Sequence, residues 1–399
     1  MTDRVDRTTA QTDGIELVHR IPFDKSAYDE SCTWYERATD IKLFNSDTVI
    51  IGGYGFSMKV EHLALVLKSE RATTEEKTVK LYCGAHRIKQ VVVLSDGGYI
   101  TIDAIQWCCD QDITVILLDW KGSLIQVLAP KHQSSAKLIC QQYRASQSDE
   151  CVGIACELIR LKIRSQVEAL KTFPERKSID TVPVVRDKKV LFENGQGRLL
   201  RSSICQFLSD SLVELPSMKT IGAIQMYESN LAKAYWDAFM DVPIKWDKKS
   251  AKTIPPHWLS ITGRRSMLSE NGQHAINPFH AALNFAYALL EGQVLRTIIA
   301  AGLEPACGFL HASTEYRRSL AYDLMEPHRA MVDAKVFSFF RKTTFQKGDF
   351  YQVLSGECRV NEELRRYILA TCRISQEAID STVQWLKETI QKVPWKSPN

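Results

Sequence analysis

The feature that most constrains the fold is a change in hydrophobic pattern near Ala129-Pro130. Before this point, short runs of β-branched and aliphatic residues end at turn-forming pairs such as Gly52-Gly53 and Gly97-Gly98. After it, apolar residues recur at helical spacing over long segments. Period-two runs closed by turn residues indicate strands, whereas a period of about 3.6 residues indicates helices. The sequence therefore predicts an α+β protein, in which a small β-rich N-terminal domain precedes a larger, mainly α-helical domain.

The same patterns give the predicted domain boundaries. A chain of 399 residues is longer than one hydrophobic core usually serves, so two domains are expected. We expect a polar N-terminal extension at 1–40, the β-rich domain at 41–128, a linker at 129–150 and the helical domain at 151–399.

Individual elements follow from periodicity and capping residues. In the β-rich domain, Thr101 is a suitable N-cap for a short helix. In the helical domain, Pro327 is expected to kink or break a helix just after Glu326. Strands are predicted at 48–51, 90–94, 113–118 and 124–128, and short helices at 62–67 and 102–109. Longer helices are predicted at 151–170, 201–213, 218–240, 278–301, 319–341, 361–371 and 376–391.

Composition excludes several classes of protein. The chain is 45% hydrophobic and 25% charged, as in ordinary globular proteins, and it contains no run of 18 apolar residues that could span a membrane. Its N-terminus lacks the apolar segment of a secretory signal, so we expect a cytoplasmic protein. The eleven cysteines form no CxxC pair, which argues against a zinc ribbon or a disulfide framework. A net charge of +4 points only weakly to an anionic partner.

The first candidate for chemistry is a carboxylate on an apolar helix face. Glu228 lies four residues after Ile224 and three before Leu231, on the stripe that the predicted helix 218–240 buries. A carboxylate on a packed face is costly unless it is paired or bound to a metal. Glu228 is therefore either a metal ligand or catalytic residue, or one half of a salt bridge to a core Arg or Lys.

A histidine and two further carboxylates follow downstream. His311 ends the apolar run Gly308-Phe309-Leu310, and Asp323 and Glu326 lie three residues apart on one face of the predicted helix 319–341. Singly, His311 could be a satisfied core histidine, and the two acids could complement the helix dipole. Together with Glu228, these mostly oxygen ligands suit Mg²⁺ or Mn²⁺ better than structural zinc.

Several strings of this sequence carry a family resemblance. The strings are GLEPACGFLH at 302–311, SLAYDLMEPHRAMVD at 319–333, YESNLAKAYW at 227–236, and HRIKQVVVLSDGGYITIDAIQWCCDQDITVILLD at 86–119. With them the chain, from about residue 41 to 391, resembles the integrase of CRISPR adaptation, the metal-dependent Cas-one endonuclease that inserts new spacers. About forty residues precede the first predicted strand, which is more than most members have.

The resemblance implies roles for particular residues. Glu228, His311 and Glu326 match the positions that hold a Mg²⁺ or Mn²⁺ ion in the family, and Asp323 is expected to support the site. The family also implies dimerisation through the β-rich domain and catalysis in the helical one. The implied reaction is attack of a DNA 3′-hydroxyl on a phosphodiester at the border of a CRISPR repeat, with hydrolysis of DNA as a side reaction.

The resemblance implies partners as well. These are double-stranded DNA with single-stranded 3′ ends, CRISPR repeat DNA, a second copy of the chain and a small ferredoxin-like adaptation protein, with no membrane. Basic residues near the site are candidates for binding phosphate, although the segment 245–265 could instead be a solvated loop. The candidates are Arg317, Arg318, Lys252, Arg264 and Arg265.

Two other functions stay open. A stand-alone, transposase-like relative of the same family would join 3′ ends without the small partner. A DNA-binding scaffold with a vestigial metal site would bind DNA without joining it.

Overall fold

The structure is a computed structural model with two compact units, 1–132 and 133–399. Of the predicted extension at 1–40, only a short strand, β1 (Ile15–Leu17), falls within the described part. The described residues are 15–17, 47–52, 56–70, 76–94, 97–119, 123–130, 135–175, 185–186, 189–190, 200–263, 275–311, 317–353, 356–394.

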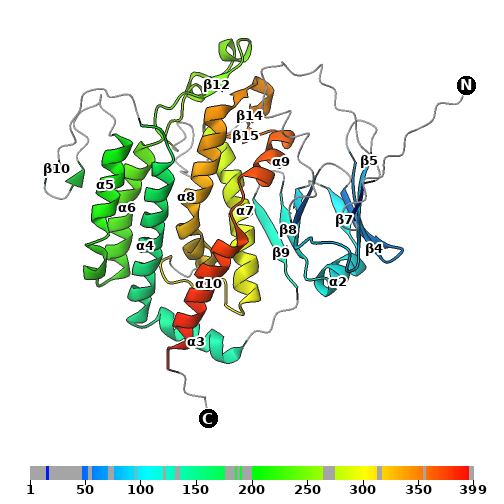
Figure 1. Cartoon of the computed structure of the whole chain (residues 1–399), viewed down its shortest axis with the longest axis horizontal. Coiled ribbons are helices and arrows are strands. Elements are labelled where there is room, and N and C mark those ends of the chain that lie inside the picture. Colours follow the sequence, from blue (N-terminus) through cyan, green and yellow to red (C-terminus); the bar gives the residue numbers. More distant parts are fainter. Residues whose placement is uncertain are drawn as a thin grey trace, which may run out of the picture. The chain divides into compact units, whose positions relative to one another are not determined.

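The described residues of the first unit form two β-sheets and one helix (Figure 1). One sheet has the strand order β1-β5-β4-β3-β7, and the other has the order β2-β6-β8-β9, in which β2, β6 and β8 are parallel and β9 is antiparallel. The helix is α2 (Ile102–Asp110), whose N-cap Thr101 accepts a hydrogen bond from Ala104 N as predicted. The strands are β2 (Thr48–Gly52), β3 (Phe56–Glu61), β4 (Ala64–Glu70), β5 (Glu76–Tyr82), β6 (Gln90–Leu94), β7 (Gly98–Ile100), β8 (Thr114–Leu118) and β9 (Leu124–Leu128).

Both sheets and α2 contribute to one apolar core. Alternate residues of β4 and β5 enter it, Leu65 and Leu67 from one strand and Val79 and Leu81 from the other. In β5 the neighbouring Thr78 and Lys80 are only partly buried, the period-two pattern of a strand that buries one face, whereas β4 also buries Ala64 and Val66 and is covered on both faces. The predicted strands at 48–51, 90–94, 113–118 and 124–128 are thus confirmed as β2, β6, β8 and β9.

The short helix predicted at 62–67 is wrong. His62 and Leu63 form the turn of an antiparallel hairpin between β3 and β4, with φ angles of 48° and 67°. Two successive residues with positive φ match the two-residue turns whose twist suits a hairpin. The segment after them, rich in leucine, therefore continues as strand β4.

The second unit is mainly helical, as predicted. Its helices are α3 (Ala136–Ser146), α4 (Glu150–Lys171), α5 (Arg201–Ser211), α6 (Ile221–Asp237), α7 (Pro278–Ala300), α8 (Ser319–Lys342), α9 (Glu362–Thr371) and α10 (Gln376–Gln391). Short strands are β10 (Val185–Arg186), β11 (Lys189–Val190), β12 (Lys245–Trp246), β13 (Thr344–Phe345), β14 (Phe350–Gln352) and β15 (Cys358–Val360). Single 3₁₀ turns are η2 (Leu215–Ser217), η3 (Ser250–Lys252), η4 (Pro256–Trp258) and η5 (Lys347–Asp349).

Helix α8 is the centre of this unit. It packs against α4 on one side and α7 on the other, and α4 also contacts α5 and α6 (Figure 1). Helix α7 is buried on nearly all sides, which explains its almost continuous apolar sequence. None of the described helices is long and apolar enough to cross a membrane.

Two expectations about this unit need correction. Helix α8 runs through Pro327 without a break. Proline removes one backbone hydrogen bond, and burial of the surrounding residues of α8 between its neighbours outweighs that loss. The stretch 129–150, expected to be a linker, contains helix α3. Ser135 is the N-cap of this helix and accepts a hydrogen bond from Leu138 N.

Candidate metal centre

A loop before α8 carries His311, and Asp323 of α8 holds that loop. The buried Asp323 carboxylate accepts hydrogen bonds from the backbone N–H groups of Phe309 at 2.5 Å, Leu310 at 3.0 Å and His311 at 2.9 Å. Three successive amides pointing at one carboxylate form an anion-binding nest. The side chain of Asp323 therefore fixes the backbone that presents His311.

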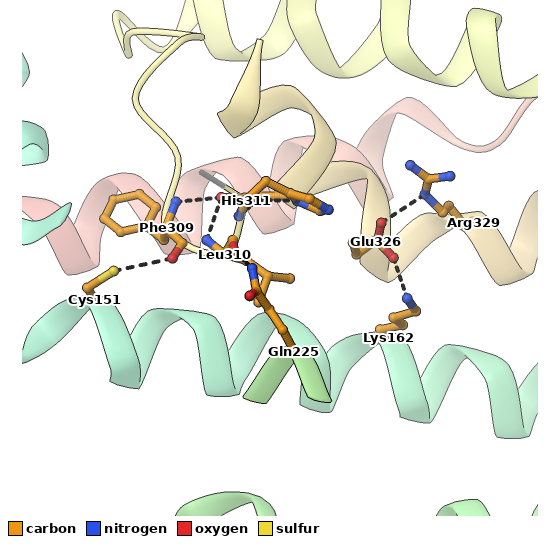
Figure 2. Close-up of polar contacts among 9 residues, drawn as sticks. Cys151, Lys162, Gln225, Phe309, Leu310, His311, Glu326 and Arg329 are labelled. Atoms are coloured by element: carbon orange, nitrogen blue, oxygen red, sulfur yellow. Dashed lines mark hydrogen bonds and ion pairs between the residues drawn. The ribbon is translucent and has the colours of Figure 1, made fainter. Parts of the chain in front are cut away.

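Two other helices brace the same loop (Figure 2). Cys151 Sγ of α4 donates to Phe309 O at 3.3 Å, and Gln225 Nε2 of α6 donates to Leu310 O at 2.6 Å. Gln225 lies one helical turn before Glu228, so α6 contacts the loop and supplies an acid from neighbouring turns.

Gly308 allows this close packing. A Cβ atom at that position would lie 2.8 Å from Asp323 Oδ2 and 2.8 Å from Ser319 Cβ. Both distances are shorter than side chains tolerate, so a residue without a Cβ is required for the loop to approach α8.

The imidazole of His311 has a defined hydrogen-bonding state. Its Nδ1 lies 2.7 Å from Asp323 Oδ1, and the carboxylate can only accept from it. Nδ1 must therefore carry the proton, and Nε2 is left with the lone pair that a metal or a proton needs. The His311 side chain is 28% exposed, whereas that of Asp323 is fully buried.

Glu228 and Glu326 meet at a lysine. Lys162 of α4 forms ion pairs with Glu228 Oε1 and with Glu326 Oε2, the latter at 2.6 Å. Arg329 Nε contacts the other oxygen of Glu326, Oε1, at 3.1 Å. In Figure 2 the Glu326 carboxylate lies between Lys162 and Arg329, and His311 projects from its loop on the same side.

The charges in this cluster stabilise one another. Burial raises the pKa of Glu326, but the charges of Arg329 and Lys162 outweigh it and hold that pKa at about 2. Burial lowers the pKa of Lys162, yet Glu326 and Glu228 together keep it above its ordinary value. A positive charge on His311 acts on the pKa of Glu326 in the same direction as Arg329 and Lys162 do.

The structure therefore brings two of the three expected ligands together around a cation, and the third stands nearby. Within the described ranges, no three His, Cys, Asp or Glu side chains surround one point closely enough to bind a metal. The donor set nevertheless fits a hard divalent ion, because two carboxylates already share one positive charge beside an imidazole whose Nε2 has a lone pair.

Lys162 and Arg329 were not predicted from the sequence as parts of this site. Lys162 lies four residues after Leu158 and three after Ile159, both fully buried, so its position on the packed face of α4 was a usable signal. Arg329 lies three residues after Glu326 on α8. That spacing alone suggests an ion pair.

A second polar cluster lies next to the first. Buried Asp333 of α8 accepts hydrogen bonds from the hydroxyl groups of Tyr235 on α6, at 2.9 Å, and Tyr287 on α7. The guanidinium of Arg329 stands over the Tyr287 ring, 5.0 Å from its centroid. These contacts join α6, α7 and α8 behind Glu326 and limit the movement of Arg329.

The candidate DNA-binding residues differ in their surroundings. Lys252 is exposed on η3, and Arg317 is exposed with its guanidinium 5.5 Å from the Tyr322 ring centroid. Arg318 Nη1 contacts Glu291 Oε1 of α7 at 3.2 Å. Arg264 and Arg265 lie outside the described residues.

The tryptophans of the basic segment 245–265 support the fold. Trp258 is 2% exposed and stacks on Trp246 at a centroid distance of 6.0 Å, and Trp246 Nε1 donates to Trp258 O. Phe345 and Phe350 complete this aromatic cluster. A buried Trp258 cannot stack on a DNA base. Among the described residues of this segment, exposed lysines such as Lys252 remain candidates for binding DNA phosphate.

Comparison with known proteins settles the family. The family model described as CRISPR associated protein Cas1 matches residues 49–373, most of the chain. The chain belongs to the Cas1 family. The resemblance inferred from the motifs is confirmed, and so is the α+β fold.

Individual relatives of this Cas1 chain are distant. It is 24% identical over 302 residues to the CRISPR-associated protein Cas1 3 of Methanobrevibacter ruminantium, which covers 75% of this chain and 80% of that protein. It is 23% identical over 337 residues to the CRISPR-associated endonuclease Cas1 1 of Archaeoglobus fulgidus, which covers 84% and 89%.

Solved structures show the same fold. A casposase bound to its integration product has a TM-score of 0.67 at 23% identity, with 88% of this chain and 92% of that chain covered. A Cas1 protein from Thermotoga maritima has a TM-score of 0.60 at 15% identity, with 89% and 100% covered. A partial Cas6-RT-Cas1–Cas2 complex contains a chain with a TM-score of 0.52 at 15% identity.

Proposed function

We propose that this Cas1-family chain is a metal-dependent DNA integrase and endonuclease of CRISPR adaptation. It joins the 3′-hydroxyl ends of new spacer DNA to the repeat array by transesterification. The observation that carries this proposal is the convergence of Glu228 and Glu326, from two helices, on one cation beside His311. Both acids and the histidine are residues that the family motifs indicate, and Lys162 and Arg329 join them there.

Each residue of the candidate metal centre has its own role. Glu228, Glu326 and His311 Nε2 would hold Mg²⁺ or Mn²⁺. When bound, the metal supplies positive charge that polarises the attacked phosphate and helps to ionise the attacking hydroxyl. Asp323 keeps the proton of His311 on Nδ1, so that Nε2 can bind the metal or take a proton. Arg329 keeps Glu326 ionised at neutral pH.

The substrates and partners follow the family. We propose that the chain binds double-stranded DNA with single-stranded 3′ ends and the CRISPR repeat, in the cytoplasm. We propose further that it works as a homodimer with the small ferredoxin-like adaptation protein, consistent with the solved Cas1–Cas2 complex that contains a similar chain. Arg317 and Lys252 are exposed candidates for contacting DNA phosphate, and each such contact adds about 0.9 to the salt dependence of binding.

A strand-transfer assay tests the proposal. The full chain, the small partner, a duplex with 3′ overhangs and a repeat duplex are mixed in Mn²⁺, and joined products are counted. His311→Ala should lower joining by about 10³-fold, because it removes a metal ligand or proton acceptor. Glu168→Ala, on an exposed ion pair of α4, is the control and should join as the wild type does. Wild-type activity in His311→Ala would refute the catalytic assignment.

Two observations favour other functions. The TM-score of 0.67 to a casposase supports a stand-alone, transposase-like enzyme, which would join ends equally well without the small partner. The pairing of both acids with Lys162 is also what a DNA-binding scaffold with a vestigial metal site would show. Such a scaffold would bind DNA and give no joined product in either metal.

A further inference from the structure

The two acids of the candidate metal centre are each already paired with a cation in the absence of a metal. Glu228 and Glu326 carry two negative charges, and Lys162 and Arg329 carry two positive ones. The side chains of Lys162 and Glu326 are only 13% and 8% exposed, so water screens these charges poorly. A divalent cation added beside the Lys162 ammonium would place two cations close together in a partly buried site, which is unfavourable.

The two cations are held in different ways. Arg329 contacts only the Oε1 side of Glu326, and its guanidinium is also placed over Tyr287. Lys162 instead stands between Glu326 Oε2 and Glu228 Oε1, the oxygens that face each other across the site. A metal shared by the two acids would need the position that the Lys162 ammonium occupies.

Lysine is suited to leaving such a position. Its ammonium is carried on four flexible methylene groups and is strongly hydrated, whereas a guanidinium makes a rigid planar contact. The Lys162 side chain is 13% exposed, so part of it already reaches solvent. The Lys162 side chain can therefore exchange its two carboxylates for water without any movement of the helix.

We propose that Lys162 is a resident counter-cation that a divalent metal must displace. In the metal-free protein its ammonium holds Glu228 and Glu326 together, and on metal binding it withdraws from between them. This inference rests on the proposed function, because it assumes that the two acids bind a metal. It assigns to Lys162 the role of a positioning residue that also lowers the affinity of the site for metal.

Metal binding to purified variants tests the inference. The full chain is stripped with EDTA, desalted and titrated with MnCl₂ while free Mn²⁺ is followed by electron paramagnetic resonance. Lys162→Met keeps the length of the side chain and removes the charge, so the Mn²⁺ Kd should fall about tenfold or more. Lys171→Met removes an exposed charge from the same helix and should change Kd by less than about twofold. Glu228→Gln should abolish binding.

The outcomes separate this inference from the function on which it rests. A Kd for Lys162→Met that equals or exceeds that of the wild type overturns the displacement of Lys162 and leaves the metal site standing. Absence of Mn²⁺ binding in wild type, or binding that Glu228→Gln leaves unchanged, overturns the metal site itself. In that case the proposed function fails together with the inference.

A second measurement needs no substitution and covers the case in which Lys162→Met does not fold. The wild-type chain is acetylated briefly with a water-soluble N-hydroxysuccinimide ester, with and without saturating Mn²⁺, and its peptides are quantified by mass spectrometry. Release from the two carboxylates should raise the acetylation rate of Lys162 several-fold, whereas exposed Lys233 should not change. An unchanged or lower rate at Lys162 with Mn²⁺ bound would contradict the inference.

Discussion

The two units of this chain bury different kinds of side chain. In the described part of the β-rich unit, the buried polar residues are Thr48, Ser57, Gln90 and Thr114, none of which carries a charge. The helical unit buries Asp323, Glu326 and Asp333 close to Lys162 and Arg329. Apolar burial stabilises a fold more reliably than buried ion pairs do. The contrast indicates that burial in the first unit mainly stabilises the fold. In the second unit, the buried charges of the candidate metal centre lower the stability that burial would otherwise provide.

The largest expected effect comes from Glu326. Glu326→Ala leaves Arg329 without its carboxylate and removes one of the two acids that hold Lys162. Unpaired buried charge should lower the free energy of unfolding by about 3–5 kcal/mol. Strand transfer should also fall by about 10³-fold or more. Urea unfolding and the joining assay measure the two losses, and a variant that loses stability but joins normally would show that the acid is only structural.

A cavity in the β-rich unit should affect stability alone. Leu65 is fully buried in β4, and Leu65→Ala should lower the free energy of unfolding by about 2–5 kcal/mol. The candidate metal site lies in the other unit, so the Mn²⁺ Kd of the folded protein should stay within about twofold of the wild type. Loss of metal affinity in step with stability would remove the distinction between the two units.

A smaller effect is expected where the His311 loop meets α8. In Gly308→Ala the new Cβ would collide with Asp323 Oδ2 and Ser319, so the loop must shift. We expect strand transfer to fall about 10–100-fold and the free energy of unfolding to fall by about 1–3 kcal/mol. Gly153→Ala in α4 is the matched control, since a Cβ there meets nothing within 4 Å. Equal activity of the two variants would argue against close packing of the loop.

The smallest expected effect is a loss of stability at low pH that comes from His86 in the β-rich unit. Burial, followed by the charge of Lys89, lowers the pKa of His86, and a backbone hydrogen bond with Ile88 opposes this shift only in part. The unfolded chain then binds the proton more tightly, so stability should be lost as pH falls through the unfolded pKa of about 6.5. His86→Phe, which keeps the contact with Trp107, should reduce that loss.

Urea midpoints at pH 7.5 and 5.5 check the His86 prediction. Burial also lowers the pKa of His328 in the helical unit to about 4, which adds a loss of the same sign that the variant retains. The wild type should therefore lose more stability between the two pH values than His86→Phe does. An equal loss in both proteins would show that His86 is not responsible.

Local sequence signals predicted much of the fold. The Thr101 cap, the strands at 48–51 and 90–94 and the apolar periodicity of α6 and α8 are all encoded within a few residues. The prediction of a helix at 62–67 was wrong because leucine and alanine occur in helices as well as in strands. The left-handed backbone of His62 and Leu63 makes the chain turn into strand β4 instead. The expected break at Pro327 was wrong because packing of α8 outweighs the loss of one backbone hydrogen bond.

The site was harder to predict because its contacts are distant in sequence. The spacing around Glu228 allowed either a metal or a basic partner, and that partner, Lys162, lies 66 residues upstream on another helix. Asp323 likewise accepts its hydrogen bonds from the amides of Phe309, Leu310 and His311 only because the loop folds back on α8. The family motifs indicated which acids matter, and only the structure shows what holds them.

We propose that the charge on Glu228 serves chemistry rather than stability. Glu228→Gln keeps the size of the side chain and leaves Lys162 paired with Glu326. The direct test is the rate of 3′-end joining in Mn²⁺ by Glu228→Gln and wild type, each with its unfolding curve. We predict a rate about 10³-fold lower and a free energy of unfolding within about 1 kcal/mol of the wild type. A joining rate within tenfold of the wild type would contradict the account.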